Sequence, residues 1–274
     1  MKKKQADLIY ALKNWRTVHI SEVESGLKCG CVCPCCKEQL VAKKGNKMIH
    51  HFSHSKGTEC KYGYETSLHY AAKEIISKYE KFTIPRVNLT LNPYKSNEII
   101  SEAKEIKVDK VTLEQRCGDI IPDVIIYSGG KELLVEIFVT HKVDEQKIEK
   151  IKNMNISAIE IDLSGISNNI TIDELSNLII NETKNKYWLY NALINKYEKA
   201  FDEASETLQF YRIKQASYIR NCPINIRNYK GSSYAVFEFD CKSCDYLIDY
   251  SLGRYIKCSG RRKIAKTKDL VQGS

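Results

Sequence analysis

The sequence predicts an α/β protein in which a mixed β-sheet core is flanked by helices and a small cysteine-rich module lies at each end. Ten of the eleven cysteines lie before residue 61 or after residue 221 of the 274-residue chain. The region between them alternates between helical and strand-like periodicity, and two strand-like runs meet at a Gly-Gly pair suited to a hairpin turn. We expect an N-terminal module (1–61), an α/β core (62–166), a helical linker (167–216) and a C-terminal module with a basic tail (217–274).

The composition excludes several classes of protein. The chain is 43% hydrophobic and has no low-complexity tract, so it is not expected to be disordered. No run reaches the roughly 20 apolar residues of a membrane helix, and the basic start lacks the apolar stretch of a signal peptide. We therefore expect a cytoplasmic protein that does not contact a membrane, in which thiols stay reduced and cysteine clusters favour metal binding.

The first cysteine cluster has the spacing of a zinc site. Cys33 and Cys36 form a C-x2-C pair, and His51, His54 and Cys60 follow a short basic segment that reads as a hairpin. Two thiolates and two of these later residues would complete a tetrahedral site. We favour His54 and Cys60. Because four ligands are present and none needs to be water, the site is expected to be structural, and the metal would supply much of the module's folding free energy.

Two alternatives remain open for this cluster. Cys29 or Cys31 could supply a ligand, since they precede Cys33 by four and two residues. The cysteines could also be reduced thiols that bind no metal.

A helix is expected from about residue 64 to residue 81. Its apolar residues recur at helical spacing, while Glu65, His69 and Lys73 are four apart and form a polar stripe beside the apolar face. This stripe could be no more than the solvated edge of an amphipathic helix.

The next pattern is a hairpin that pairs two acids. If Gly129-Gly130 forms the two-residue turn, Ser128 lies opposite Lys131, and counting outward places Asp123 opposite Glu136. Like charges at this position destabilise a sheet, and a bound Mg²⁺ or Mn²⁺ would turn the repulsion into attraction. An exposed pair in a slightly different register is the alternative. A helix capped by Asp144 and the strand-like run SAIEIDLS would complete the mixed sheet.

These motifs together resemble a known family. The CPxC knuckle followed by HFSH, the ExxLHxxAK stretch from Glu65 to Lys73, and PDV with VEIFVTH look like the competence protein CoiA-like family. The acids also resemble the PD-(D/E)xK core of restriction-endonuclease-like nucleases. The resemblance covers roughly residues 29–165. It implies a restriction-endonuclease-like domain behind a zinc-binding segment, with DNA as the substrate.

One residue departs from the nuclease pattern. Phe138 stands two residues after Glu136, where the pattern usually has Lys. Lys147, one turn into the following helix, is the first candidate for a migrated lysine, and Lys142 is the second. His141 could bind the metal, a phosphate or the attacking water.

The resulting hypothesis is a magnesium-dependent hydrolysis of phosphodiester bonds. Asp123 and Glu136, with help from Glu65, would hold the ion, and Lys147 or His141 would orient the water. His69, Lys73 and Arg116 are candidate DNA contacts, although charged surface residues would look the same in the sequence.

The region 171–215 is expected to be helical throughout, beginning with a possible capping box, Thr171 to Glu174. Tyr187, Trp188 and Tyr190 could stack on bases, but packing within the helical region is the commoner role of such aromatics.

The C-terminal region predicts a second zinc site and a basic tail. Four thiolates on successive hairpins would make a zinc ribbon: Cys222, Cys241, Cys244 and Cys258. Beyond it, Arg261, Arg262 and Lys263 belong to a basic run that offers phosphate contacts, or simply a solvated tail.

The leading functional hypothesis is therefore a cytoplasmic, metal-dependent DNA nuclease acting in DNA uptake, recombination or defence against foreign DNA. Recombination or defence proteins are possible partners, and a homodimer would allow both strands to be cut. The alternatives are a nuclease-like protein that binds nucleic acid without cutting and a zinc-stabilised scaffold for protein interactions.

Overall fold

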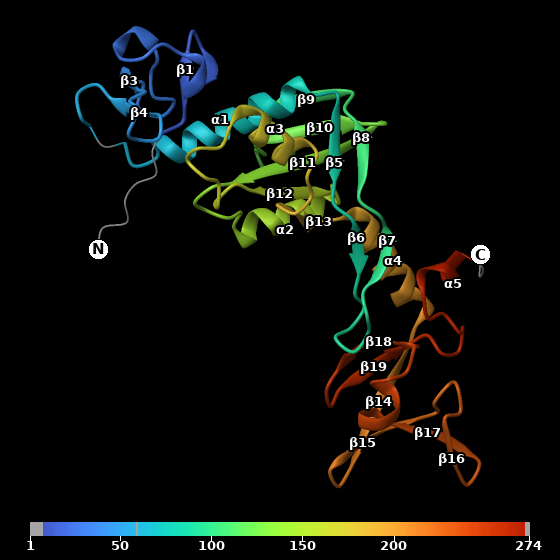
Figure 1. Cartoon of the computed structure of the whole chain (residues 1–274). Helices are drawn as coiled ribbons and strands as arrows, with labels where there is room; N and C mark the ends of the chain where they lie inside the picture. The colour runs from blue at the N-terminus through green and yellow to red at the C-terminus, as the bar shows by residue number, and fades with distance from the viewer. Residues whose placement is uncertain (1–7, 59, 272–274) are drawn as a thin grey trace. The chain divides into compact units, whose positions relative to one another are not determined.

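The protein is a mixed α/β chain that divides into two compact units (Figure 1). A computed structural model describes residues 8–58 and 60–271. Unit 1 comprises Met1–Pro85 and Ala103–Tyr190, and unit 2 comprises Arg86–Glu102 and Asn191–Ser274. These boundaries differ from those of the four segments expected from the sequence. Residues 86–102 belong to the same unit as residues that begin about a hundred positions later, at Asn191.

A five-stranded mixed sheet forms the centre of unit 1, in the order β13-β12-β11-β10-β9. Strands β11 and β12 are parallel and the other neighbours are antiparallel. The expectation of a mixed sheet is confirmed. Its strands are β9 (Lys110–Leu113), β10 (Val124–Ser128), β11 (Lys131–Phe138), β12 (Ala158–Asp162) and β13 (Lys186–Tyr190).

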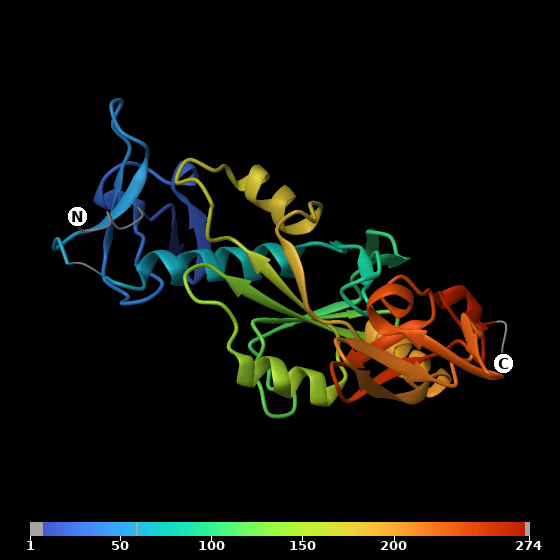
Figure 2. The ribbon, with the colours of Figure 1, turned by 90° about the horizontal axis from the view of Figure 1, so that it is seen from below.

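Three helices flank this sheet, and α1 and α2 lie on opposite faces of it in Figure 2. They are α1 (Gly63–Lys78), α2 (Glu145–Met154) and α3 (Ile172–Ile180). Successive residues of a strand point to opposite faces of the sheet, so the strands contribute to two cores. Val124 and Val135 pack in the core with α1 and α3, whereas Ile125 and Leu134 pack in the core with α2. Both faces of the central strands are therefore buried.

The predicted hairpin and its register are confirmed. Strands β10 and β11 pair with Ser128 opposite Lys131 and Val124 opposite Val135. Gly129 and Gly130 have φ angles of 54° and 75°, the left-handed conformation that a type I′ turn requires at both central positions. The paired register ends with Val124 opposite Val135; Asp123 is the residue before Val124, and Glu136 is the residue after Val135.

Helix α2 begins at the cap that its sequence predicts. The Asp144 carboxylate accepts a hydrogen bond from the Lys147 amide, and Asn155 ends the helix in the left-handed conformation. Removing such an N-cap typically costs about 1 kcal/mol. The cap fixes where Lys147 enters the helix, which matters for the site described below.

The prediction of continuous helix over 171–215 is wrong. The expected capping box from Thr171 to Glu174 is present, but the helix it begins, α3, ends at Ile180. The chain then forms β13, a second helix, α4 (Ala192–Ala204), and a strand, β14 (Glu206–Ile213). The run KYWLY is rich in aromatic side chains that favour strands, and Tyr187, Trp188 and Tyr190 lie in that strand rather than in a helix.

The N-terminal part of unit 1 consists of two hairpins with a small core. This core includes Ile20, Leu40 and Phe52, whereas Ile9 and Tyr10 pack into the larger core with α1. The amide of Thr17 also donates to the Glu74 carboxylate on α1 at 2.8 Å. The strands are β1 (Tyr10–Lys13), β2 (Arg16–His19), β3 (Leu40–Lys43) and β4 (His51–His54), and a further pair in unit 1 is β5 (Lys81–Ile84) with β8 (Lys104–Lys107).

Unit 2 contains a six-stranded sheet in the order β16-β17-β15-β14-β19-β18, together with the pair β6–β7. Its core includes Leu89 from the early segment and Phe201 from α4. The remaining elements are β6 (Val87–Leu89), β7 (Glu98–Ser101), β15 (Ala216–Arg220), β16 (Arg227–Tyr229), β17 (Ser232–Val236), β18 (Leu247–Ser251), β19 (Tyr255–Cys258) and α5 (Thr267–Val271). No helix among the described residues is both long and apolar enough to cross a membrane.

Candidate functional site

The first candidate site is the Cys/His cluster in the N-terminal part of unit 1. Ligand atoms of Cys33, Cys36, His54 and Cys60 all lie within 4.8 Å of one another. This is the set that the sequence favours, and three thiols with one imidazole are a common ligand set of structural zinc. The cluster could hold a zinc ion.

Local backbone structure brings the four ligands together. The amide of Lys37 donates to the Cys33 carbonyl at 3.0 Å, which closes the knuckle around the C-x2-C pair. In the β3–β4 hairpin Leu40 pairs with His54, so the imidazole returns beside the knuckle, and its Nε2 lies 3.3 Å from the Cys36 sulfur. Cys60 lies three residues before Gly63, where α1 begins.

The alternative ligands lie elsewhere. Cys29 and Cys31 are buried in the small core, where the Cys29 thiol donates to the Leu40 carbonyl. His51 Nδ1 lies 2.9 Å from the Ile49 carbonyl. Burial raises the pKa of the Cys33 thiol, and burial with neighbouring thiols raises the pKa of Cys60 to about 12. A bound cation would deprotonate such thiols and remove this cost.

The second candidate site lies where the β10–β11 ribbon meets α1 and α2. Asp123 immediately precedes β10, and its Oδ2 accepts a hydrogen bond from the Ile137 amide at 2.9 Å. Glu136 lies within β11 and is 4% exposed. The two carboxylates influence each other, because the charge of Asp123 helps to raise the pKa of Glu136.

Asp123 is held by two residues of the polar stripe on α1. Its carboxylate lies 3.5 Å from His69 Nδ1 and 3.2 Å from Lys73 Nζ. Burial raises the pKa of Asp123, but His69, Lys73 and the Ile137 amide outweigh burial and lower it to about 2. Asp123 is therefore ionised at neutral pH.

Glu136 has the opposite electrostatic character. Burial raises its pKa to about 7, although the amine of Lys147 lies 2.7 Å from its Oε1. The charge of that amine opposes the effect of burial, but burial outweighs it. The Lys147 amine is held in turn by the Ile121 carbonyl at 3.1 Å. The sequence's first candidate for a migrated lysine thus lies against the second acid.

A third acid, Glu160, joins this row and was missed by the sequence reasoning. Strand β12 pairs with β11 in parallel, which sets Glu160 beside Glu136. Glu160 is 5% exposed, and one of its carboxylate oxygens accepts a hydrogen bond from the Val143 amide at 3.2 Å. The sequence signal for Glu160 was an acid between Ile159 and Ile161 in a mostly apolar strand. The sequence alone does not show that this acid lies beside Glu136, because that pairing depends on how the chain crosses over through α2.

The remaining candidates lie around the acids in different ways. Glu65, in the first turn of α1, contacts His141 at 3.5 Å. Lys142, the second lysine candidate, lies with its amine 5.4 Å from the centre of the Phe138 ring rather than against Glu136. The aromatic ring that replaces the usual lysine therefore has a cation beside it.

The candidate DNA contacts differ in their availability. Lys73 is buried and lies 2.6 Å from Glu114 as well as beside Asp123, so its charge is already neutralised. Arg116, by contrast, is exposed and lines a groove of about 350 Å³ with Lys147 and Lys150. Asp119 and Asp144 line the same groove, so its wall carries two acids beside the three cations.

Residues 12–63 match the family model described as competence protein CoiA, N-terminal domain. The match contains all four residues of the Cys/His cluster and ends where α1 begins. Comparison with curated proteins and with solved structures gave no match. The CoiA-like segment therefore accounts for the metal cluster, whereas the acids near α1 and α2 lie outside it.

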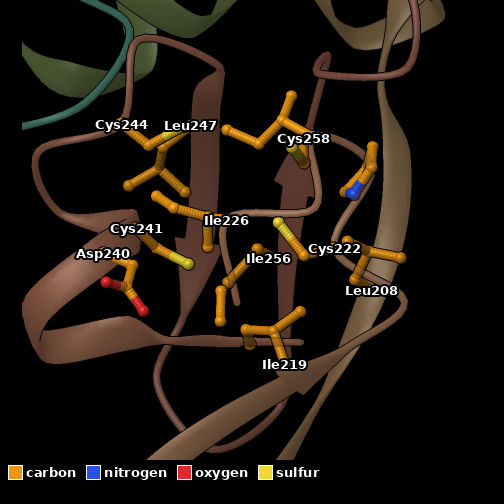
Figure 3. A pocket seen from close by; sticks show the side chains of 13 residues that line it. Leu208, Ile219, Cys222, Ile226, Asp240, Cys241, Cys244, Leu247, Ile256 and Cys258 are labelled. Atoms are coloured by element: carbon orange, nitrogen blue, oxygen red, sulfur yellow. The ribbon is translucent and has the colours of Figure 1, made fainter. Parts of the chain in front are cut away.

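The third candidate site is the four-cysteine cavity of unit 2, shown in Figure 3. All four predicted cysteines line one cavity of about 20 Å³ together with apolar side chains: Cys222, Cys241, Cys244 and Cys258. Among the described residues, however, only the N-terminal cluster has its ligand atoms within 4.8 Å of one another. Burial, followed by the nearby thiols, raises the pKa of Cys241 to about 12. The four cysteines therefore surround one cavity, with their thiols more widely spaced than the ligand atoms of the N-terminal cluster.

The predicted basic tail is only partly available to an anion. Arg261 is paired with Glu206, with its Nη2 at 3.1 Å from a carboxylate oxygen. Arg262 and Lys263 are exposed. The tail thus offers fewer free charges than its sequence suggests.

Proposed function

We propose that the protein is a metal-dependent nuclease that hydrolyses phosphodiester bonds in DNA. The observation that carries this proposal is the amine of Lys147 at 2.7 Å from Glu136, an acid whose pKa the charge of Asp123 helps to raise. Two carboxylates and an amine are the groups that the reaction needs alongside a divalent cation. Phe138 stands where the nuclease pattern usually has a lysine, and Lys147 from α2 would supply the missing amine.

Asp123 and Glu136, with Glu65 as a further candidate, would hold Mg²⁺ or Mn²⁺, because these ions prefer carboxylate oxygens. The position of Glu136 supports this assignment: it is buried, the charge of Asp123 helps to raise its pKa, and a cation shared by the two carboxylates would remove that repulsion. When bound, the ion would lower the pKa of a water molecule and stabilise charge developing on the phosphate.

The other side chains would act on orientation and charge. His69 and Lys73 keep Asp123 ionised and fix its direction. Lys147 would orient the attacking water or a phosphate oxygen, and His141, beside Glu65, is the second candidate for that role. Arg116 would bind the DNA backbone in the neighbouring groove.

Both cysteine clusters are proposed to bind structural zinc. The N-terminal set would hold the start of α1, which carries Glu65, His69 and Lys73 to the acids. In unit 2 the four thiols would have to close around the ion, since tetrahedral Zn–S bonds of about 2.3 Å require them to approach one another. Two zinc equivalents per chain by elemental analysis are expected, and one equivalent would contradict the second site.

The test of the nuclease is cleavage of labelled DNA by the full chain with Mg²⁺. Asp123→Asn should abolish cleavage and weaken Mn²⁺ binding, measured by electron paramagnetic resonance. Glu132→Gln is the matched control, because Glu132 is an exposed acid near the start of β11. Unchanged cleavage by Asp123→Asn would overturn the assignment.

A second function is favoured by one observation. Phe138 occupies the usual lysine position, and lysine amines already lie against both acids. A protein with this arrangement could hold DNA without cutting it. Salt-sensitive DNA binding by the wild type, with no Mg²⁺-dependent product, would establish that function.

The cellular role follows from the substrate. Similarity of residues 12–63 to the competence protein CoiA N-terminal domain supports a role connected with DNA uptake. Recombination and defence against foreign DNA would use the same chemistry, and proteins of those processes are the expected partners. A homodimer would bring two sites to a duplex.

A further inference from the structure

The six-stranded sheet of unit 2 has two faces of opposite character. On one face, Phe210, Ile219 and Ala235 pack toward the four-cysteine cavity. The register places the alternate residues on the other face: Tyr211 pairs with Tyr218, and Arg220 pairs with Tyr234. Strand β16 adds Tyr229 to this second face through its pairing with Ser232.

We define the tyrosine face as Tyr211, Tyr218, Arg220, Tyr229 and Tyr234. These residues line a hollow of about 450 Å³, to which Ile213 and Ser232 also contribute. Tyr211 is 40% exposed and Tyr229 is 66% exposed. Large aromatic rings so exposed on one side of a sheet indicate a surface that meets a partner.

The charge around the tyrosine face identifies the kind of partner. Between residues 207 and 237 the chain has five cations and no acid. Arg227 is paired with Asp240, but in the part of the chain that the structure describes no carboxylate lies within 4.0 Å of the other four cations, which are Arg212, Lys214, Arg220 and Lys230. The surface therefore suits a polyanion.

The geometry of the cations relative to the rings indicates which kind of polyanion the tyrosine face suits. The guanidinium carbon of Arg220 lies 4.2 Å from the centre of the Tyr211 ring, and the Lys230 amine lies 5.5 Å from the centre of the Tyr229 ring. Tyr218 and Tyr234 are tilted neighbours with ring centres 6.1 Å apart. Rings next to cations can stack on unpaired bases while the cations bind the phosphates. In a duplex the bases are stacked on one another and would not reach these rings.

We propose that the tyrosine face binds single-stranded DNA, with Tyr211 and Tyr229 stacking on bases and Arg220 and Lys230 contacting phosphates. The choice of DNA rests on the proposed function. The surface would hold one strand of the nucleic acid whose backbone is cut in unit 1. It is formed entirely by β14–β17 and does not require the acids of unit 1 to be active.

The test is fluorescence anisotropy of a labelled 20-nucleotide oligo-dT with the full chain and no added Mg²⁺. Tyr211→Ala and Tyr229→Ala should each raise the Kd by about 5- to 100-fold, the range found for removing one base–aromatic stack. Tyr211→Phe and Tyr229→Phe should stay within about twofold, since the ring is kept. Arg220→Gln should lower the slope of log affinity against log salt by about 0.7.

Tyr79→Ala is the matched control, because Tyr79 is a 42% exposed tyrosine outside the tyrosine face. Its affinity should equal that of the wild type, and circular dichroism should show every variant folded. Four results would overturn the proposal: equal loss in the control, no loss in folded Tyr211→Ala and Tyr229→Ala, tighter binding of duplex, or tighter binding of oligo-U than of oligo-dT. If sedimentation showed that Tyr229→Ala abolishes a dimer without changing DNA affinity, the face would be a contact between two copies instead.

Failure of this proposal is distinguishable from failure of the nuclease. Oligonucleotide affinity and cleavage are measured separately on Tyr211→Ala and Tyr229→Ala, whose changes lie in unit 2, whereas the acids lie in unit 1. Tyrosine-dependent binding without cleavage would leave the inference standing and remove the nuclease. Cleavage together with binding that does not depend on the tyrosines would leave the nuclease standing and remove the inference about the tyrosine face.

Discussion

The two cysteine clusters occupy different positions relative to the cores of their units. In unit 1 the Cys/His cluster adds Cys33 to the small core, while the twenty buried side chains of the main core include no cysteine. In unit 2 three of the eight buried side chains in the sheet's core are themselves ligand candidates, Cys222, Cys241 and Cys258. A metal would therefore fasten a module to a self-sufficient core in unit 1, whereas in unit 2 it would be part of the core.

The largest expected effect is the loss of a ligand in unit 2. Cys241→Ser should remove one of the two proposed zinc equivalents and destabilise unit 2 by on the order of 5 kcal/mol or more, since the proposed metal would contribute directly to folding. Hydrogen exchange measured by mass spectrometry should show β14–β19 losing protection together. Cys117→Ser is the control, because Cys117 lies in neither cluster. Full protection of the sheet without zinc would remove the contrast between the two units.

A smaller and more local effect is expected in unit 1. Cys36→Ser should remove the other zinc equivalent and cost on the order of 3 kcal/mol in the N-terminal module. Exchange should rise in residues 8–58, while β10–β12 keep their protection because their apolar cores remain intact. If β10–β12 lost protection as well, the main core of unit 1 would depend on the metal after all.

A buried lysine in the main core of unit 1 offers a third test of how that core is stabilised. Lys186 is the first residue of β13 and is 3% exposed; its amine donates to the carbonyls of Thr83 and Ile180 at 2.7 and 3.1 Å. Burial lowers its pKa to about 7, an effect only partly opposed by Glu182. Between pH 7 and pH 9 the unfolded lysine keeps a proton that the folded one loses. The free energy of unfolding should therefore rise with pH, by up to about 1.4 kcal/mol per pH unit.

Denaturant titrations at pH 7 and pH 9 measure this rise. Lys186→Met should abolish it, whereas Lys184→Met should keep it, because the Lys184 side chain is exposed. Comparing variants removes the contribution of cysteines and tyrosines that also titrate in this range. An equal rise in Lys186→Met would show that the lysine is charged in the folded core.

Local sequence patterns were sufficient for the parts of the fold that depend on neighbours along the chain. The Gly129-Gly130 turn gave the β10–β11 register, and the Cys33 and Cys36 spacing with His54 and Cys60 gave the metal cluster. Both depend on contacts within about 30 residues. The roles of Asp123, Glu136 and Lys147 in catalysis stay predictions, although the structure brings the three together.

Patterns that depend on distant partners were misread or missed. Residues 186–190 were included in a helix because nearby leucines have helical spacing, yet their pairing with β12 makes them a strand. Glu160 became part of the acidic row only through the parallel pairing of β11 and β12. Residues 86–102 gave no sign that they belong with the C-terminal sheet, since their partners lie more than 100 residues away.

The early segment 86–102 also has a consequence for how the protein is made. Asn92 donates to the Leu247 carbonyl at 2.7 Å, and Glu98 accepts a hydrogen bond from the Thr267 amide, 169 residues later. At typical translation rates the ribosome needs roughly 10–30 s to synthesise that intervening stretch. The core around Leu89 includes Phe201 and Ala204 from α4 and Ile248 from β18, so a stop before residue 201 would leave the β6–β7 pair without these partners.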